Sequence, residues 1–324
     1  MNCLYCGEPL EDSQRDAAEW HPRCIRVFFG THDMPQLHIT PEQIQKLVEK
    51  AIHMGATVAG VQKKLSLHLS TQEGSERLTL KDHPFGYILK PQTKEFQALP
   101  EAEDLSMRMA KATGIQTVLH GLIRVNDESA SLAYITKRAD REIKESHGHY
   151  HIKKYAMEDF CQLSDRLTQY KYRGSYEQCA KIIWRYSSTS GLDLSELFFR
   201  VVFSFVIGNS DMHLKNLSLI ETSPASRVFT LSPAYDLLPV NVVLPEDQDE
   251  MALTLNGKKS NISRRDFLRF AANAKIQEKT ALNLLEKVIS MKDEYLQMTA
   301  KSLLPEHMKE ALKMLVLERI RRLQ

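Results

Sequence analysis

The sequence predicts an α+β protein of two lobes, a small mixed α/β lobe followed by a larger, mainly helical lobe, with a small cysteine- and histidine-containing module at the N-terminus. Three observations lead to this prediction. Three cysteines and a histidine gather within residues 1–35, short β-prone segments dominate residues 36–140, and segments with helical spacing of apolar residues dominate residues 141–324. We therefore expect three structural regions with these boundaries.

The length and composition are those of a globular protein. The chain has 324 residues, of which 43% are hydrophobic and 26% charged, and its net charge is +2. This charge gives no overall electrostatic reason to bind nucleic acid. The first residues do not read as a signal peptide, and the longest apolar stretch, residues 197–208, is interrupted by Arg200 and too short for a membrane span. We expect a cytoplasmic protein that binds neither membranes nor nucleic acid directly.

The N-terminal module has the spacing of a structural zinc site. Cys3 and Cys6 form a Cys-x2-Cys pair, and His21 and Cys24 form a His-x2-Cys pair. Each pair can chelate one ion from a short turn, and four nitrogen and sulfur ligands complete a closed tetrahedral zinc site. The alternative is a set of reduced cysteines beside an unrelated histidine.

The mixed lobe is expected to contain an early helix, three strands, a second helix and a strand pair. The early helix is "HITPEQIQKLVEKAIHMG", which Gly55 ends, and the second is "LPEAEDLSMRMAKATGI", which Gly114 ends. The expected strands are "KKLSLHLS", "SERLTLKD", "GYILKP", "TVLHGLIRVN" and "SLAYITKRAD".

The later lobe is expected to be helical except for one hairpin. Apolar residues recur at helical spacing in "MEDFCQLSDRL", "YEQCAKIIWRYS" and "LSELFFRVVFSFVIG". Residues 217–236 contain two β-prone segments around a turn, so they predict a hairpin. Further helices are expected from Ser263, a candidate N-cap, to the C-terminus.

A polar cluster between apolar segments carries the candidate chemistry. Asp211 and Asn216 have the D-x-x-x-x-N spacing of a phosphotransfer loop, in which the aspartate accepts the proton of the attacking hydroxyl and the asparagine oxygen ligates Mg²⁺. Asp236 follows the hairpin twenty residues after Asn216 and is a candidate second Mg²⁺ ligand. Taken alone, the cluster also suits a simple turn after a helix.

Residues earlier in the chain extend this pattern. Lys90 ends an apolar strand, where a lysine that grips nucleotide phosphates is expected, and Glu101 or Glu103 could hold it in an ion pair. A loop of small residues, "GATVAGVQ", suits close approach of the backbone to phosphate. Alone, Lys90 could be a solvated strand-end lysine and the glutamates favourable first-turn charges. Together and in this order, these signals predict a protein-kinase-like fold that uses ATP and Mg²⁺.

At these residues the sequence resembles the HipA-type serine/threonine kinases, the toxins of bacterial toxin–antitoxin systems. "TVAGVQKKLSL" is similar to the family's nucleotide loop, "YILKPQ" to its ATP-lysine strand, and "GNSDMHLKN" through "LSPAYDLLP" to its catalytic and metal-binding segments. The chain resembles a short, HipT-like form in which the Cys/His module replaces an N-terminal subdomain. By this resemblance the missing subdomain is a separate small protein.

The resemblance assigns roles to individual residues. It implies Asp211 as the catalytic aspartate, His213 as a support of its loop, and Lys215 as a cation that neutralises the transferring phosphate. Helix residue Glu103 matches the family better than Glu101. The implied nucleotide and magnesium contacts are Val58, Ala59, Gly60, Lys90, Glu103, Thr136, Lys137, Asn216 and Asp236.

Two positions depart from the family pattern at the adenine-holding hinge. "ITKRADR" stands where Glu-Arg-Phe-Asp-Arg is usual, so Lys137 and Ala139 differ from it. Thr57 occupies the position of the family's autophosphorylated serine, and phosphate there would repel the ATP phosphates and switch the kinase off.

The resemblance also implies partners. Family toxins phosphorylate aminoacyl-tRNA synthetases and thereby inhibit translation, and they bind an antitoxin with a DNA-binding helix-turn-helix. Two alternatives remain open at the level of sequence. One is a pseudokinase whose nucleotide site regulates an antitoxin complex, and the other is a small-molecule kinase on the same fold.

Overall fold

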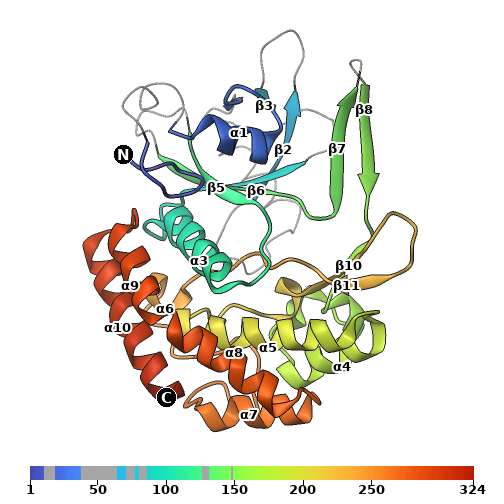
Figure 1. Ribbon diagram of the computed structural model, residues 1–324, viewed down its shortest axis with the longest axis vertical. Coiled ribbons are helices and arrows are strands. Elements are labelled where there is room, and N and C mark those ends of the chain that lie inside the picture. Colours follow the sequence, from blue (N-terminus) through green and yellow to red (C-terminus); the bar gives the residue numbers. More distant parts are fainter. Residues whose placement is uncertain (11–18, 38–63, 71–76, 80–85, 126–130, 147–148) are drawn as a thin grey trace. The chain divides into compact units, whose positions relative to one another are not determined.

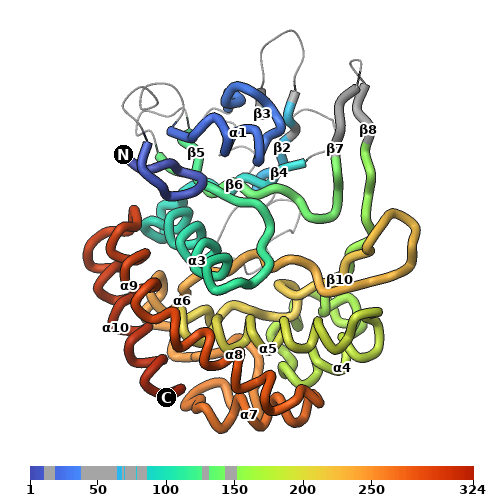
Figure 2. Tube along the Cα trace, in the orientation of Figure 1, coloured from blue at the N-terminus to red at the C-terminus, as the bar shows by residue number. Residues whose placement is uncertain are grey.

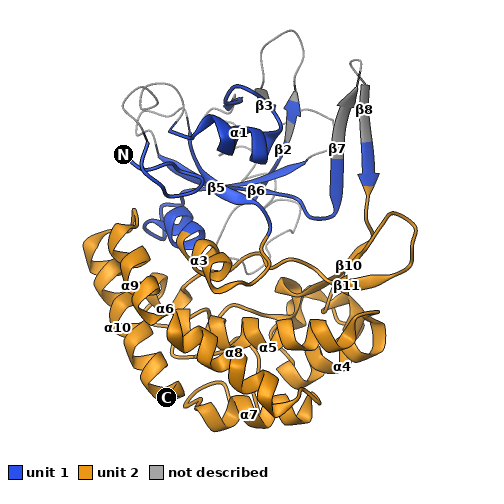
Figure 3. Ribbon diagram, viewed as in Figure 1, with its two compact units in different colours: residues 1–104, 118–153 blue, residues 105–117, 154–324 orange. Residues whose placement is uncertain are grey.

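The computed structural model divides the chain into two compact units (Figures 1 and 3). One comprises Met1–Asp104 and Val118–Lys153, and the other Leu105–Thr117 and Lys154–Gln324. The first unit continues past residue 140 because it includes two paired strands, β7 (Arg141–Ser146) and most of β8 (His149–Lys154). The residues described are 1–10, 19–37, 64–70, 77–79, 86–125, 131–146 and 149–324.

The described part of the first unit is built on a six-stranded sheet in the order β1-β3-β2-β4-β6-β5. The short β1 pairs with β3 in parallel, and the other four pairings are antiparallel. The predicted strands of this lobe are confirmed, whereas the predicted helix ending at Gly55 lies outside the described residues. The strands are β1 (Gln36–Leu37), β2 (Leu65–Ser70), β3 (Arg77–Thr79), β4 (Tyr87–Pro91), β5 (His120–Arg124) and β6 (Leu132–Lys137).

The N-terminal residues cover the outer edge of this sheet. Strand β5 lies at the end of the strand order, and both main-chain groups of Leu122 that face outward are bonded, its N–H to the Leu4 carbonyl at 3.0 Å and its carbonyl to the Trp20 indole Nε1 at 2.9 Å. A Cβ at Gly121 would lie 2.9 Å from the Trp20 ring, so this close approach requires glycine. Covering an edge strand removes a site for unwanted strand pairing.

Helix α1 (Pro22–Phe29) connects this module to strand β4. The rings of Phe28 and Phe29 lie 5.6 and 5.5 Å from the ring of Tyr87, the first residue of β4. Pro22 suits the first helical turn, and Gly30 ends the helix in the left-handed conformation with φ of 81°. The Cys/His module is therefore part of the core of the first unit.

Helix α3 (Leu99–Thr113) contributes residues to both units. Its leucine, alanine, methionine, glutamate and lysine residues favour helix, as predicted from the sequence. The side-chain carbonyl of Gln92 accepts a hydrogen bond from the N–H of Leu99 and so caps the first turn. Gly114, with φ of 101°, ends the helix at the predicted position.

The second unit is organised around helix α5 (Ser190–Ile207), which packs against four helices, α4 (Tyr176–Tyr186), α7 (Arg264–Asn273), α8 (Glu278–Ser290) and α10 (Glu306–Leu323). Figure 2 traces these helices from yellow-green to red along the C-terminal half of the chain. Residues 197–207 are all buried, and all of them except Arg200 and Ser204 are apolar, as expected of a helix in the centre of a core. None of the described helices is long and apolar enough to span a membrane.

The predicted cap at Ser263 is confirmed, because Ser263 and Asp266 form a capping box at the start of α7. The second unit also contains helices α6 (Val240–Val243) and α9 (Lys292–Lys301).

The predicted hairpin at residues 217–236 is confirmed. Strands β10 (Ser218–Glu221) and β11 (Phe229–Leu231) are antiparallel, with Leu219 opposite Leu231. A third strand, β9 (Met157–Asp159), pairs with the other edge of β10.

The helix predicted for "MEDFCQLSDRL" is wrong. This segment contains β9 and a short 3₁₀ turn, η3 (Gln162–Ser164). The N–H of Asp159 bonds to the side chain of Gln162, and the N–H of Gln162 bonds back to the side chain of Asp159, which fixes a turn after the strand. Pairing with β10 satisfies the backbone of β9, so tertiary contacts override the helical spacing of the sequence.

Candidate active site and candidate metal centre

The candidate catalytic loop begins where helix α5 ends. Gly208 has φ of 73°, and a Cβ there would lie 2.4 Å from the Leu315 side chain, so both conformation and space require glycine. The next residue, Asn209, is fully buried, and its side-chain oxygen accepts a hydrogen bond from the N–H of Asp211 at 3.2 Å. A buried asparagine thus turns the chain so that Asp211 follows directly after the helix.

Hydrogen bonds hold Asp211 and Asn216 together across the loop. The carbonyl oxygen of Asp211 accepts from the N–H of His213 at 2.7 Å and from the Asn216 amide Nδ2 at 3.0 Å. Because Nδ2 is the donor, the other amide atom of Asn216, Oδ1, is the one suited to ligate a cation. The Asp211 side chain is 38% exposed, so its carboxylate is accessible to a substrate.

Two aromatic side chains flank the carboxylate of Asp211. The hydroxyl of Tyr172 donates a hydrogen bond to Oδ1, and Nε2 of His213 lies 3.9 Å from the same oxygen. The two rings meet edge to face at 5.0 Å. Burial and the negative charge of Asp211 raise the pKa of Tyr172, so its hydroxyl keeps its proton. His213 was predicted to support the loop, whereas no motif or spacing pointed to Tyr172, which precedes Asp211 by 39 residues.

Lys215 is held by a carboxylate of strand β9. Its Nζ donates to Asp159 Oδ2 at 2.6 Å, and the side chains are 31% and 13% exposed. The carbonyl of Lys215 accepts from the hydroxyl of Tyr235 at 3.1 Å. The sequence did not predict the Asp159 contact because that residue was assigned to a helix.

The β10–β11 hairpin brings the segment that bears Asp236 to the catalytic loop. Beyond the paired strands the N–H of Ser232 donates to the carbonyl of Ser218, and Tyr235 contacts Lys215. Asp236 follows with φ of 58°, a left-handed conformation that is unfavourable for a residue with a Cβ. The structure thus places Asp211, Asn216 and Asp236 in one unit, with the two candidate metal-ligand segments hydrogen-bonded to each other.

The first unit contains the predicted lysine–glutamate ion pair. Lys90 Nζ donates to Glu103 Oε1, and the side chains are 4% and 2% exposed. The ammonium also lies 5.2 Å from the ring centre of Tyr134, which stands opposite Lys90 in the β4–β6 register. Glu103 rather than Glu101 is the partner of the lysine, and burial raises the pKa of Glu101.

A second buried pair lies beside this one. His120 Nδ1 is 3.1 Å from Asp104 Oδ1, and the imidazole stacks on Tyr134 at 5.8 Å. The Tyr134 ring therefore contacts both Lys90 and His120. No motif or spacing pointed to this arrangement, because β5, β6 and α3 come together only in the folded protein.

The residues assigned to the adenine-holding hinge lie at the end of β6. Thr136 Oγ1 and the N–H of Lys137 both donate to the carbonyl of Leu119, at 3.0 and 2.9 Å. Burial lowers the pKa of Lys137, although Glu142 acts in the opposite direction. Thr57, Val58, Ala59 and Gly60 lie outside the described residues.

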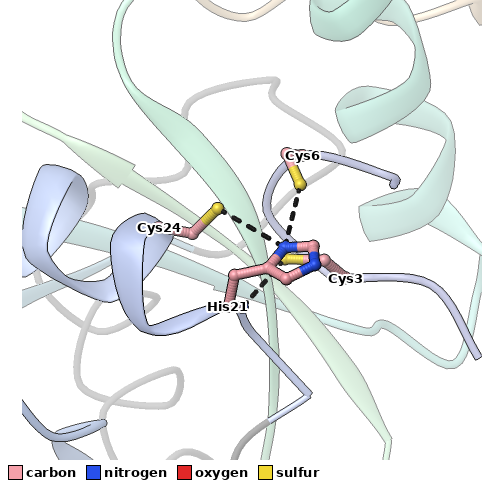
Figure 4. Close-up of side chains that lie close together, drawn as sticks. All are labelled: Cys3, Cys6, His21 and Cys24. Carbon is pink, nitrogen blue, oxygen red and sulfur yellow. Dashed lines mark hydrogen bonds between the residues drawn. The ribbon is translucent and has the colours of Figure 1, made fainter. Parts of the chain in front are cut away.

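The four predicted zinc ligands lie together (Figure 4). The sulfur atoms of Cys3, Cys6 and Cys24 and a ring nitrogen of His21 are all within 4.8 Å of one another. The ligand atoms around a tetrahedral Zn²⁺ lie roughly 3.7 Å apart, given Zn–S bonds of about 2.3 Å, so the donor set fits this ion. Burial and the two neighbouring thiols raise the pKa of Cys24 to about 12.

The histidine of this cluster is oriented for metal binding. Nδ1 of His21 lies 3.3 Å from the sulfur of Cys6 and 3.8 Å from that of Cys24. Its other nitrogen, Nε2, is 3.0 Å from the carbonyl of Pro9 and therefore carries the proton in this contact. A ligating histidine commonly donates its second ring N–H to a carbonyl or carboxylate, which leaves the first nitrogen free for the metal.

The fold and these residues define a member of a known family. The model of the HipA-like C-terminal domain matches residues 56–295, so the chain belongs to this family. The predicted resemblance to HipA-type proteins is thereby confirmed.

Individual relatives agree with this assignment. The "Putative kinase Y4dM" of Sinorhizobium fredii is 30% identical over 263 residues, which are 77% of this chain and 61% of that protein. A "Putative kinase" of Haemophilus influenzae is 26% identical over 296 residues, 85% of this chain and 83% of that protein. The chain therefore spans less than two thirds of the Sinorhizobium protein.

A solved structure confirms the fold class. A chain of the Shewanella oneidensis complex of the HipA and HipB toxin–antitoxin system with its operator DNA has a TM-score of 0.68 and 19% identity, and the match covers 86% of this chain and 70% of that chain. At this identity the likeness establishes the α+β fold of a small mixed lobe and a larger helical lobe.

Proposed function

We propose that this protein is an ATP- and Mg²⁺-dependent serine/threonine protein kinase of the HipA type. One observation carries the proposal. The loop from Asp211 to Asn216 is fixed by its own hydrogen bonds, and the segment that bears Asp236 is bonded to it. The family and two relatives named as kinases support the same reaction.

In this mechanism residues of the second unit would bind the hydroxyl group that accepts the phosphate and the magnesium ion. Asp211 would orient the substrate hydroxyl and accept its proton as the oxygen attacks the γ-phosphorus and the bond to ADP breaks. Asn216 Oδ1 and the Asp236 carboxylate would hold Mg²⁺, which supplies positive charge against the phosphate oxygens. The pair of Lys215 and Asp159 places a further ammonium on the same loop.

The first unit would hold the nucleotide. Lys90 would bind ATP phosphate oxygens, oriented by Glu103 in the way that phosphotransfer enzymes use such pairs. Val58, Ala59 and Gly60 would bring main-chain N–H groups to the phosphates, and Thr136 and Lys137 would border the adenine. Phosphate on Thr57 would oppose ATP binding by charge repulsion.

The biological role that we propose is that of a toxin. The Shewanella chain to which this fold is similar belongs to a complex with HipB and operator DNA. We propose that this chain likewise binds an antitoxin with a DNA-binding helix-turn-helix, and a separate small protein that resembles the N-terminal subdomain of longer family members. The proposed substrate is an aminoacyl-tRNA synthetase, whose phosphorylation would stop translation.

We also propose that Cys3, Cys6, His21 and Cys24 bind one structural Zn²⁺. The mutual distances of the four donors and the hydrogen bond from His21 to Pro9 support this proposal. Four protein ligands leave no position for water, so the ion would stabilise the edge of the sheet and take no part in the reaction.

Phosphate transfer from labelled ATP tests the kinase proposal. Purified wild type and Asp211→Asn would be incubated with Mg²⁺ in a lysate that contains tRNA-bound synthetases. We expect the wild type alone to label a protein band, because the amide cannot accept the proton. If both variants bind ATP and label nothing, the protein is not a kinase of these substrates, and labelling of a metabolite would indicate a small-molecule kinase.

A further inference from the structure

The segment before helix α4 approaches the candidate catalytic loop and is not explained by the proposed roles above. It contains a 3₁₀ turn, η4 (Thr168–Tyr170), followed by Lys171 and Tyr172. The carbonyl of Lys171 accepts a hydrogen bond from the N–H of Leu214, a residue of the catalytic loop, at 3.2 Å. The hydroxyl of Tyr172 donates to the carboxylate of Asp211. One short segment therefore contacts the loop through both its main chain and a side chain.

The ring of Tyr172 is fixed independently of this hydrogen bond. It meets the ring of His213 edge to face at 5.0 Å with an interplanar angle of 76°. The ammonium of Lys171 also lies over this ring, 4.9 Å from its centre. His213 is itself buried, and its Nε2 lies 3.9 Å from Asp211 Oδ1. A ring held by two neighbours presents its hydroxyl in one direction, so the hydrogen bond is preorganised.

The contact has a consequence for the carboxylate. Tyr172 and His213 both face Oδ1 of Asp211. Asp211 is 38% exposed, and an exposed aspartate can rotate about its side-chain bonds. A donor fixed on one carboxylate oxygen restricts that rotation and sets the direction in which the second oxygen points. Productive proton transfer needs this orientation, because the acceptor must lie within hydrogen-bond reach of the attacking hydroxyl.

We propose that Tyr172 is a positioning residue that orients the carboxylate of Asp211 for phosphate transfer through its hydroxyl. This inference rests on the proposed kinase function. Tyr172 acts through Asp211 and takes no proton itself. Its effect should therefore fall on the turnover of bound substrate and leave nucleotide binding unchanged.

The test compares Tyr172→Phe with the wild type in steady-state kinetics. Phenylalanine keeps the ring contacts with His213 and Lys171 and removes only the hydroxyl. We expect kcat to fall about tenfold or more, because misplacing a reacting group by about 1 Å can lower the rate by about 100-fold, while KM for ATP stays at the wild-type value. Tyr170→Phe is the matched control, since Tyr170 is two residues away and its ring packs under Arg173.

Rescue separates orientation from packing. Replacing Tyr172 with 4-aminophenylalanine restores a hydrogen-bond donor at the same position of the ring. We expect the kcat of this variant to be well above that of Tyr172→Phe and close to that of the wild type. A kcat for Tyr172→Phe equal to that of the wild type would overturn the inference. A higher kcat would also overturn it, because the hydroxyl would then be blocking the acceptor position. If the wild type itself transfers no phosphate to any acceptor, the kinase proposal fails before Tyr172 is tested.

Discussion

The buried ion pair of Lys90 and Glu103 permits a quantitative prediction for the first unit. Both side chains are almost fully buried, with 4% and 2% of their surfaces exposed to solvent. Glu103→Ala would leave the ammonium of Lys90 buried without its carboxylate. Removing one partner of a buried pair costs about 3–5 kcal/mol. The Tyr134 ring, 5.2 Å from Nζ, offsets about 1 kcal/mol of this cost, so we expect the lower end of the range.

Urea unfolding provides the assay. The chain has two tryptophans, Trp20 in the first unit and Trp184 in the second, so a Trp184→Phe background makes fluorescence report on the first unit. Glu103→Ala should lower the unfolding free energy by about 3 kcal/mol in this background. Glu101→Ala on the same helix is the control, because no ion-pair partner of Glu101 is found among the described residues, and its change should stay within about 1 kcal/mol.

A double variant separates stability from function. Lys90→Met with Glu103→Leu replaces the pair by apolar side chains of similar size, which is often neutral for stability. We expect it to recover most of the unfolding free energy and to bind ATP more weakly than the wild type. Equal losses in Glu103→Ala and Glu101→Ala would refute the reasoning, since the buried charge would then have found another partner.

Further predictions concern acid stability and metal removal. Glu250 is buried, which opposes ionisation, but hydrogen bonds from Arg322 and Ile262 lower its pKa. Its contribution is therefore present above pH of about 4.5, the unfolded value, and is lost as the pH falls through the lower folded value. We expect Glu250→Gln to cost about 1–3 kcal/mol at pH 7 and less at pH 3 in urea unfolding; a cost that does not depend on pH would contradict this. A chelator should lower the melting temperature of the wild type, measured by Trp20 fluorescence, and leave Cys3→Ser unchanged; equal shifts would refute zinc binding.

The sequence predicted those parts of the candidate sites whose residues lie close together along the chain. Asp211 and Asn216 belong to one loop, and the four metal-ligand candidates form two short pairs. Residues a few positions apart on a turn can come into contact whatever the rest of the fold does, so their spacing alone predicts the contact. The choice of Glu103 over Glu101 came from the family resemblance, and the structure shows Glu103 bonded to Lys90.

Contacts between distant segments could not be predicted. Tyr172 precedes Asp211 by 39 residues and Asp159 precedes Lys215 by 56, and no periodicity links either pair. The error at residues 157–167 has the same origin. Their apolar spacing suits a helix, but the free edge of β10 offers backbone partners that pair Met157 with Ile220. A single sequence does not show which edge a short segment will meet.

The sequence by itself determined the order of strands and helices in most of the chain, the ends of α3 and α5 at glycine, and the composition of the catalytic loop and of the Cys/His cluster. These features depend on propensity, backbone conformation and short-range spacing, which are properties of neighbouring residues. Only the tertiary structure decided that the N-terminal module covers the edge of β5, that Tyr134 lies between Lys90 and His120, and that Tyr172 and His213 flank Asp211. These arrangements arise when separate strands and helices bury their apolar faces together, and that packing selects which distant polar side chains become neighbours.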